Sequence, residues 1–277
     1  MAVLQMQRMN LVAMKQNRKA ILERLQELGA LEIDVKLEET DGIVKEDTSG
    51  QKTDFEKQAA LADHAIEILD QYAPEKKSLL APLAGKPLAG RDVYEDAVEN
   101  QHDYMEAAQK IVLLEKEISE AKAGILKLEN QQEMLDPWKR LDIPMNAEGT
   151  KTTSLFLGII GDAVTEENVL TVLKTHDPAV DAADVEILES GKDGTWLAVI
   201  CLRQDAAAAE DALRGIGFAK PSYLVEDVPI RAQEAMDRQI DALEAEIKRH
   251  SEEIAALAEY RTKLRLVSDY YRLRAEK

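Results

Sequence analysis

The sequence predicts an α+β protein in which two small α/β lobes are joined by a long antiparallel coiled coil, like a dumbbell. Three observations lead to this prediction. Apolar residues recur every seven positions in two long stretches, 104–135 and 240–264. The segment between these stretches alternates between helical and strand patterns, and a β-α-β pattern begins the chain. Heptad spacing of this kind makes helices wind around each other.

Residues 1–50 are predicted to form the first lobe. Polar and apolar residues alternate over 4–14 and again over 31–37, which is typical of strands. Between these two strands, Asn17 can cap a helix that ends at Gly29. A β-α-β unit of this size cannot bury its sheet by itself, so we expect another segment to complete the lobe.

Residues 51–147 are predicted to be the outgoing helices of the coiled coil. Thr53 and Glu56 fit a capping box at the start of the first helix. Segment 74–90 contains three prolines and two glycines, which indicate a turn. We expect the next helix to run unbroken over 92–140, and prolines then mark the exit from the coil.

Residues 148–228 are predicted to form a ferredoxin-like lobe with the element order β-α-β-β-α-β. Its elements are expected at 154–160, 165–176, 185–189, 196–202, 206–216 and 222–225. Because this lobe begins and ends beside the heptad stretches, residues 229–277 should return along the first stretch within the same chain. A parallel homodimeric coiled coil is the alternative. After Ile254 the apolar stripe moves to a period near 3.6, so the supercoil should relax there.

The bulk composition excludes several classes of protein. The chain has 53 acidic and 35 basic residues, and its net charge of −18 argues against nucleic acid as a partner. The one cysteine, Cys201, excludes an internal disulfide and suits a reducing compartment. It lies on an apolar strand, and we interpret it as a small buried hydrophobic residue. No secretory signal and no apolar run of about 18 residues are present, so we expect a soluble chain.

The sequence predicts no catalytic residue, no cofactor site and no metal site. The four histidines are scattered, and His250 lies on a d position of the second heptad stretch, where it is interpreted as a tolerated seam residue. The turn 190–194 lacks the spacing of a phosphate-binding loop. The many carboxylates are interpreted as the solvated outer faces of the helices.

Two segments depart from the acidic balance. Residues 1–24 and residues 261–277 each carry a net charge of +4. In the antiparallel arrangement these segments should come together, and such a basic end could face anionic lipid or an acidic protein. Salt bridges to neighbouring carboxylates are the alternative explanation.

In its order of elements, the chain resembles the N-terminal cytoplasmic region of subunit I (subunit a) of the V/A-type rotary ATPases. The resemblance extends over essentially all 277 residues. The stretches that carry it are 3–9, 26–29, 31–33, the exit 135–144, the strand around Gly158 and the returning helix.

That resemblance implies a non-catalytic stator arm on the cytoplasmic side of a membrane. Peripheral stalks of E and G subunits would bind both lobes, and a central-stalk subunit would approach the first lobe. The coiled coil would resist the torque of rotation. Attachment would come from a membrane-embedded half of the same subunit, which is absent here, so no ion-translocating residue is assigned. The ion (H⁺ or Na⁺) and the direction of coupling stay open, and we expect the isolated chain to be monomeric.

Two surfaces are candidates for the stalk contacts. One is the face of the first helix that bears Arg18, Lys19 and Arg24. The other is the segment of the second lobe that bears Ser222, Tyr223 and Val225.

Two other functions remain as alternatives. The chain could be a soluble coiled-coil adaptor or regulator that uses the ferredoxin-like lobe as a binding module. It could also be an enzyme with a coiled-coil arm, although both predicted lobes are small and lack paired catalytic residues.

Overall fold

The computed structural model describes residues 7–9, 11–29, 31–32, 48–75, 90–178 and 180–276. The chain divides into two compact units, Met1–Ser49 and Gly50–Lys277, each of which is described by itself. Long helices dominate the described residues, and their strands form one three-stranded antiparallel sheet. The fold is therefore α+β, as predicted.

In the first unit, a short 3-10 helix (Lys15–Asn17) leads into α1 (Arg18–Leu28). Gly29 ends this helix as predicted, with a φ of 59° that suits glycine best. The described parts of the two predicted strands, 7–9, 11–14 and 31–32, have no strand structure. The remaining residues of those two predictions lie outside the described ranges.

The second unit begins with α2 (Ser49–Tyr72). Because this helix starts four residues before Thr53, the predicted capping box is wrong, and Thr53 lies within the first turns. Of the predicted turn 74–90, only the two ends are described, and both are non-helical.

The predicted unbroken helix over 92–140 is wrong, because it is divided at Asn100. The two parts are α3 (Arg91–Glu99) and α4 (Gln101–Leu135). The side chain of Asn100 donates hydrogen bonds to the carbonyl and the carboxylate of Asp96, at 3.1 and 2.9 Å. The N–H of Asn100 still donates to the carbonyl of Asp96 and its carbonyl accepts from Tyr104, so the break lies in its backbone angles, φ −97° and ψ 19°. Local bonds of an asparagine side chain favour such non-helical conformations. At its other end, α4 passes into a 3-10 turn, Asp136–Trp138.

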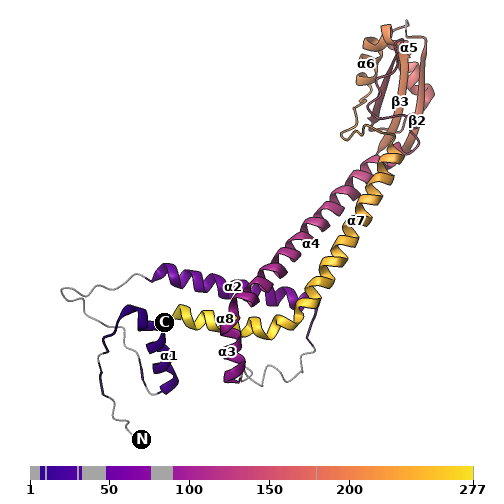
Figure 1. The fold of residues 1–277 in the computed structure, drawn as a ribbon. Helices are drawn as coiled ribbons and strands as arrows, with labels where there is room; N and C mark the ends of the chain where they lie inside the picture. The colour runs from indigo at the N-terminus through magenta and orange to yellow at the C-terminus, as the bar shows by residue number, and fades with distance from the viewer. Residues whose placement is uncertain are drawn as a thin grey trace, which may run out of the picture. The chain divides into compact units, whose positions relative to one another are not determined.

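The returning helix α7 (Pro229–Ala256) runs antiparallel to α4 in the same chain, as predicted (Figure 1). A 3-10 turn, Leu257–Tyr260, then separates α7 from α8 (Arg261–Glu276). This turn lies where the heptad pattern was expected to end. Figure 1 shows that the pair leads to the sheet at one end and to α2, α3 and α8 at the other.

The lobe at the far end contains β1 (Thr153–Ile160), α5 (Glu166–His176), β2 (Ala183–Gly191), β3 (Gly194–Leu202) and α6 (Ala206–Gly215). The strands are antiparallel in the order β1-β3-β2. These elements follow the predicted β-α-β-β-α order.

The predicted last strand over 222–225 is wrong. Instead, Ala219 alone pairs with Ile159, through N–O distances of 2.8 and 2.9 Å. Pro221 follows two residues later and has no N–H to donate to a ladder. Tyr223 and Val225 then pack against a core on the other face of the sheet.

The sheet is covered on both faces. Alternate residues of β1 and β3 face α5 and α6, and Leu197 and Val199 are fully buried there. The other face, through Leu157 and Trp196, packs against the end of the α4–α7 pair. Because side chains alternate along a strand, this arrangement joins the lobe to the helix pair through a continuous apolar core.

Two parts of the helix pair differ in their packing. Near α8, α2 packs against the pair as a third helix, and its residues such as Ala65 and Leu69 complete a core with α4, α7 and α8. We call this part the three-helix section, counting α8 as the continuation of α7. Farther along, residues 122–134 of α4 and 237–249 of α7 include no buried side chain, and we call this part the two-helix span. None of the described helices is both long and apolar enough to cross a membrane.

Candidate functional site

The described residues offer little for catalysis. Among them, no group of three or more His, Cys, Asp or Glu side chains is placed to hold a metal ion. Cys201 is buried on β3, and burial raises the pKa of its thiol, which disfavours the reactive thiolate. The structure instead concentrates its buried polar contacts at the two ends of the helix pair.

The first of these ends is the elbow, which we define as the junction of the C-terminal end of α2 with the 3-10 turn and the start of α8. Arg261 lies at its centre and is 5% exposed. One of its terminal nitrogens donates to the carbonyl oxygen of Leu69, at 2.8 Å, and to that of Ala73. The carbonyl of Leu69 also accepts from the backbone N–H of Ala73 at 2.8 Å, and Ala73 lies just past the end of α2. The cation therefore caps the C-terminal end of α2, where it is favoured by the helix dipole.

Two carboxylates balance the charge of this buried arginine. Nε of Arg261 lies 3.4 Å from Asp70 Oδ1, and Nη1 lies 3.4 Å from Glu75 Oε1. Glu75 also accepts from Arg265 at 2.8 Å, and this contact, the strongest of its influences, lowers the pKa of the Glu75 carboxyl. The elbow is therefore held by hydrogen bonds and ion pairs between segments far apart in the chain.

A second contact ties α3 to α8. The ammonium of Lys263 pairs with Asp96, which also accepts from the hydroxyl of Tyr104 at 3.1 Å and from Asn100. Lys263 contributes most to a lowered pKa of the Asp96 carboxyl, and Asp96 in turn raises the pKa of Lys263. Asn100, at which the predicted long helix is divided, thus hydrogen-bonds the same Asp96 carboxylate that pairs α3 with Lys263 of α8.

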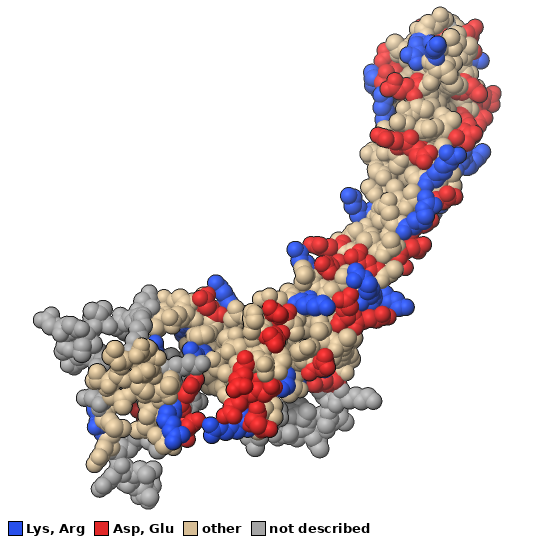
Figure 2. Space-filling view, in the orientation of Figure 1, with Lys and Arg blue, Asp and Glu red and all other residues tan. Residues whose placement is uncertain are grey.

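The predicted basic end is largely neutralised on the α8 side, and Figure 2 shows acidic and basic side chains interspersed along the α4–α7 pair. Besides the pairs made by Arg261, Lys263 and Arg265, Arg272 pairs with Asp63 of α2. The guanidinium of Arg274 lies over the ring of Phe55, 5.2 Å from its centroid. Salt bridges to nearby carboxylates, the alternative explanation, therefore account for most of this segment's positive charge. The meeting of the two basic segments stays a prediction.

The opposite end of the helix pair is anchored by Trp138, which is 1% exposed between the helices and the sheet. Buried Gln233 of α7 donates to the carbonyl of Gln132 at 3.1 Å and to Asp136 Oδ1 at 2.7 Å. Gln132 donates back to Asp237 at 2.6 Å. These reciprocal bonds fix the register of α4 against α7 at the point where the lobe begins.

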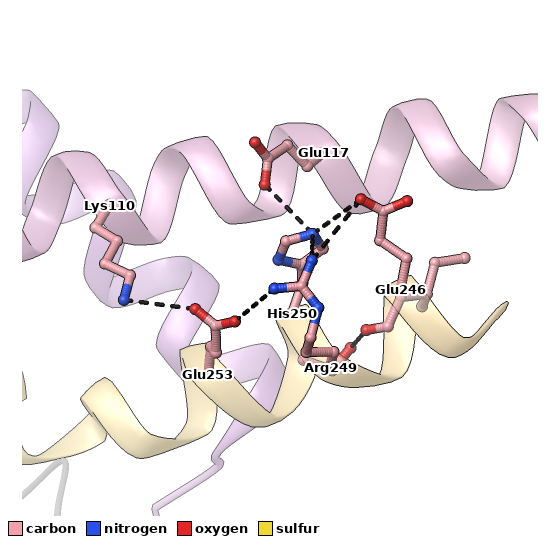
Figure 3. A network of polar contacts seen from close by, with 8 residues as sticks. Lys110, Glu117, Glu246, Arg249, His250 and Glu253 are labelled. Atoms are coloured by element: carbon pink, nitrogen blue, oxygen red, sulfur yellow. Dashed lines mark hydrogen bonds and ion pairs between the residues drawn. The ribbon is translucent and has the colours of Figure 1, made fainter. Parts of the chain in front are cut away.

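A polar network crosses the helix pair between these anchors, at the start of the two-helix span (Figure 3). His250 of α7, 5% exposed, lies 3.4 Å from Glu117 of α4 and 3.3 Å from Glu246. Beside it, Lys110 of α4 pairs with Glu253 at 3.4 Å. The seam position predicted for His250 is confirmed, but the histidine also makes cross-helix contacts that the sequence did not reveal.

The predicted contact residues of the first unit lie on α1. Arg18 and Arg24 are exposed, and Arg24 pairs with Glu27 at 2.6 Å. Lys19 lies on the same helix, but its side chain is outside the described part of the structure. The role of these three residues stays a prediction.

The predicted contact residues of the second lobe lie in the loop between α6 and α7. Ser222 is exposed, whereas Tyr223 and Val225 are half-buried against the core that contains Trp138. Between them, Leu224 points outward and is 51% exposed. Tyr223 and Val225 therefore attach the loop to the lobe, while Ser222 and Leu224 are the residues that a partner can reach.

One shallow cavity of about 220 Å³ lies beside this loop. It is lined by Phe156, Glu210, Arg214, Phe218 and Lys220. Both of its cations pair with Glu210, at 3.5 and 3.7 Å, and Arg214 also pairs with Asp211 at 3.0 Å. The two carboxylates balance the two cations.

Sequence reasoning missed the role of Arg261, which was counted only as part of a basic segment. A signal was present, because Arg261 continues the helical spacing of Ile254, Leu257 and Leu264 and so lies on the buried stripe. The sequence carries no comparable signal for the pairing of Gln233 with Asp136, because that pairing depends on the register between the helices.

No protein-family model matches this sequence, and neither does any curated protein. Among solved structures, the chain is similar to the crystal structure of the cytoplasmic N-terminal domain of subunit I, a homologue of subunit a, of V-ATPase. This is the same kind of domain that the sequence resembles. The match has a TM-score of 0.49 and 15% sequence identity, and it covers 95% of this chain and 84% of the other. At this level of similarity, function has to be argued from the residues of the chain itself.

Proposed function

We propose that this chain is a non-catalytic stator arm of a V/A-type rotary ATPase, on the cytoplasmic side of the membrane. The observation that carries the proposal is that the α4–α7 pair is fastened at both ends. The Trp138 core holds it at the lobe, and at the other end it shares a core with α2, which Arg261 ties to the start of α8. A helix of 35 residues, such as α4, is about 50 Å long. A pair of that length, fastened at both ends, can transmit a force.

Partner binding belongs to the same proposal. The stator arm would bind E/G peripheral stalks through the lobe of the second unit and through the first unit. A central-stalk subunit would bind near the first unit, and a membrane-embedded half of the subunit would anchor the arm. The sequence resemblance supports these assignments. The exposed residues of the α6–α7 loop and of α1 are the surfaces that we assign to stalk contacts.

The test is binding of the purified chain to a purified E/G heterodimer, measured by isothermal titration calorimetry. We expect binding that weakens when Leu224→Asp and Ser222→Arg are combined. We also expect weakening when Arg18→Glu, Lys19→Glu and Arg24→Glu are combined. Lys116→Glu is the matched control, because Lys116 is an exposed residue of α4 that pairs with Glu120 of the same helix, at 3.6 Å.

Failure of the unchanged chain to bind any E/G heterodimer would reject the proposed function. Binding that survives both sets of substitutions would retain the function but reject the two assigned surfaces. Circular dichroism of each variant establishes that a loss of binding does not come from a loss of folding.

A further inference from the structure

His250 lies at a boundary in the helix pair. It is the first buried residue of α7 after the two-helix span, which ends at residue 249. Beyond His250, toward α8, residues of α2 contribute to the core. Its Nε2 atom lies 3.3 Å from Glu246 Oε1 on its own helix and 3.4 Å from Glu117 Oε2 on α4. One ring nitrogen therefore faces carboxylates from both helices (Figure 3).

The protonation state of this imidazole decides which contacts Nε2 can make. The other ring nitrogen, Nδ1, is buried, and no described residue is its hydrogen-bond partner. If the proton is on Nδ1 alone, Nε2 can accept from Nη2 of Arg249, at 3.2 Å, but its lone pair also faces two carboxylates. The imidazolium gives up the bond from Arg249 and keeps Nδ1–H unpaired, but its charged Nε2–H faces the carboxylates of both helices as an ion-pair donor.

Charged groups from both helices surround the ring. From α4, Glu117 and Lys110 contribute one negative and one positive charge. From α7, Glu246 and Glu253 are negative, and Arg249 is positive. This set has a net charge of −1 with neutral histidine and 0 with the imidazolium.

Two neighbouring groups complete the surroundings of the ring. Arg249 is the cation next to it, and its guanidinium is paired with Glu253 at 3.0 Å. From α2, Tyr72 hydrogen-bonds Glu115, and burial together with that carboxylate raises the pKa of Tyr72 to about 12. The phenol therefore stays neutral near physiological pH, and Glu115 adds a further negative charge to this part of α4.

We propose that His250 is a pH-sensitive clasp, in which protonation adds an ion pair across α4 and α7 and tightens them where the two-helix span begins. Histidine is the side chain that ordinarily changes charge between about pH 5 and 8. The helix pair would therefore stiffen as its surroundings become more acidic. This inference concerns the helix pair alone and does not rest on the stator function, so the two can fail separately.

The test is hydrogen exchange of the whole chain at about pH 7.5 and pH 5.5, corrected for the effect of pH on intrinsic exchange. A buffer with EDTA removes any contribution from adventitious metal. We expect protection of the amides in 246–254 and 114–121 to rise about three- to tenfold at the lower pH, the effect of one partly screened ion pair. His250→Gln should abolish the rise, and Glu117→Gln should reduce it.

His102→Gln is the matched control. His102 is an exposed histidine of α4 that faces Glu106 on its own helix, so its removal should leave the rise unchanged. The clasp would be rejected if His250→Gln showed the same rise as the unchanged chain. It would also be rejected if protection fell at the lower pH, since repulsion by Arg249 would then dominate. If His250→Gln does not fold, Glu117→Gln decides, because it keeps the histidine and removes only one charge.

Discussion

The three-helix section and the two-helix span both contain α4 and α7, but they are held together differently. In the three-helix section, α2 covers the seam, so Ile111, Ile118 and Ile254 are fully buried. In the two-helix span, the seam residues Ile125, Leu128 and Leu243 are only half-buried. The heptad pattern is similar in both, so in this chain the packing of α2 accounts for the difference between full and half burial of the seam. The span should be the softer part of the pair.

The largest expected effect separates the two parts directly. Leu264→Ala removes a fully buried side chain from the three-helix section and should lower the free energy of unfolding by about 3 kcal/mol, because it leaves a cavity. Leu243→Ala in the two-helix span should cost about 1 kcal/mol, since less apolar area is lost. Urea unfolding of both variants measures the difference. Equal costs would contradict the distinction between the two parts.

The next effect tests the cap at the elbow. Arg261→Met keeps much of the side-chain volume but leaves the carbonyls of Leu69 and Ala73 and the carboxylate of Asp70 without their cation. We expect a loss of about 2–3 kcal/mol in urea unfolding. Arg265→Met is the matched control, because the Arg265 side chain is 41% exposed and should cost less than about 1 kcal/mol. If Arg265→Met lowered the free energy of unfolding as much as Arg261→Met, burial of the Arg261 guanidinium would not be the cause of the loss.

Acid should loosen the elbow before it affects the two-helix span. Lys263 and Arg265 lower the pKa values of the Asp96 and Glu75 carboxyls, respectively. A lowered pKa in the folded chain means that the contribution to stability is present above the ordinary values, 3.8 and 4.5, and is lost as the pH falls below them. Hydrogen exchange at about pH 3 should show less protection in α8 than at pH 5.

A variant identifies the carboxylate responsible. Asp96→Asn removes the titrating group, so the difference in α8 protection between the two pH values should shrink. Asp241→Asn, at an exposed residue of the two-helix span, should leave that difference unchanged. The same difference in all three chains would assign the acid response to other groups.

The smallest expected effect lies inside the two-helix span. A Cβ added at Gly124 would meet Leu243 Cδ1 at 3.3 Å. Leu243 is half-buried and can rotate away, so the gain in helix propensity should prevail, and Gly124→Ala should stabilise the chain by about 0.5 kcal/mol. Thermal unfolding measures the sign. Destabilisation would show that the helices are packed tightly at this position and that the span is stiffer than we infer.

The sequence alone determined the elements whose patterns are local. The heptad stretches located α4 and α7, and the positions of α5, α6 and the three strands followed from periodicity and turn residues. Tertiary structure decided the rest. Tyr223 and Val225, for example, joined a core instead of a fourth strand. The break at Asn100 is local, because its side chain bonds Asp96 only four residues away, but the apolar pattern did not reveal it.

The contacts that hold the fold together were also decided by tertiary structure. The composition placed Arg261 in a basic segment of the surface. In the folded chain it is buried, because the C-terminal end of α2 lies against it and the carbonyl of Leu69 accepts from its guanidinium. The stalk-contact surfaces remain predictions from the resemblance. The physical reason for this division is distance along the chain: helix and strand periodicities depend on neighbours a few residues apart, whereas Arg261 and Leu69 are 192 residues apart and meet only in the folded chain.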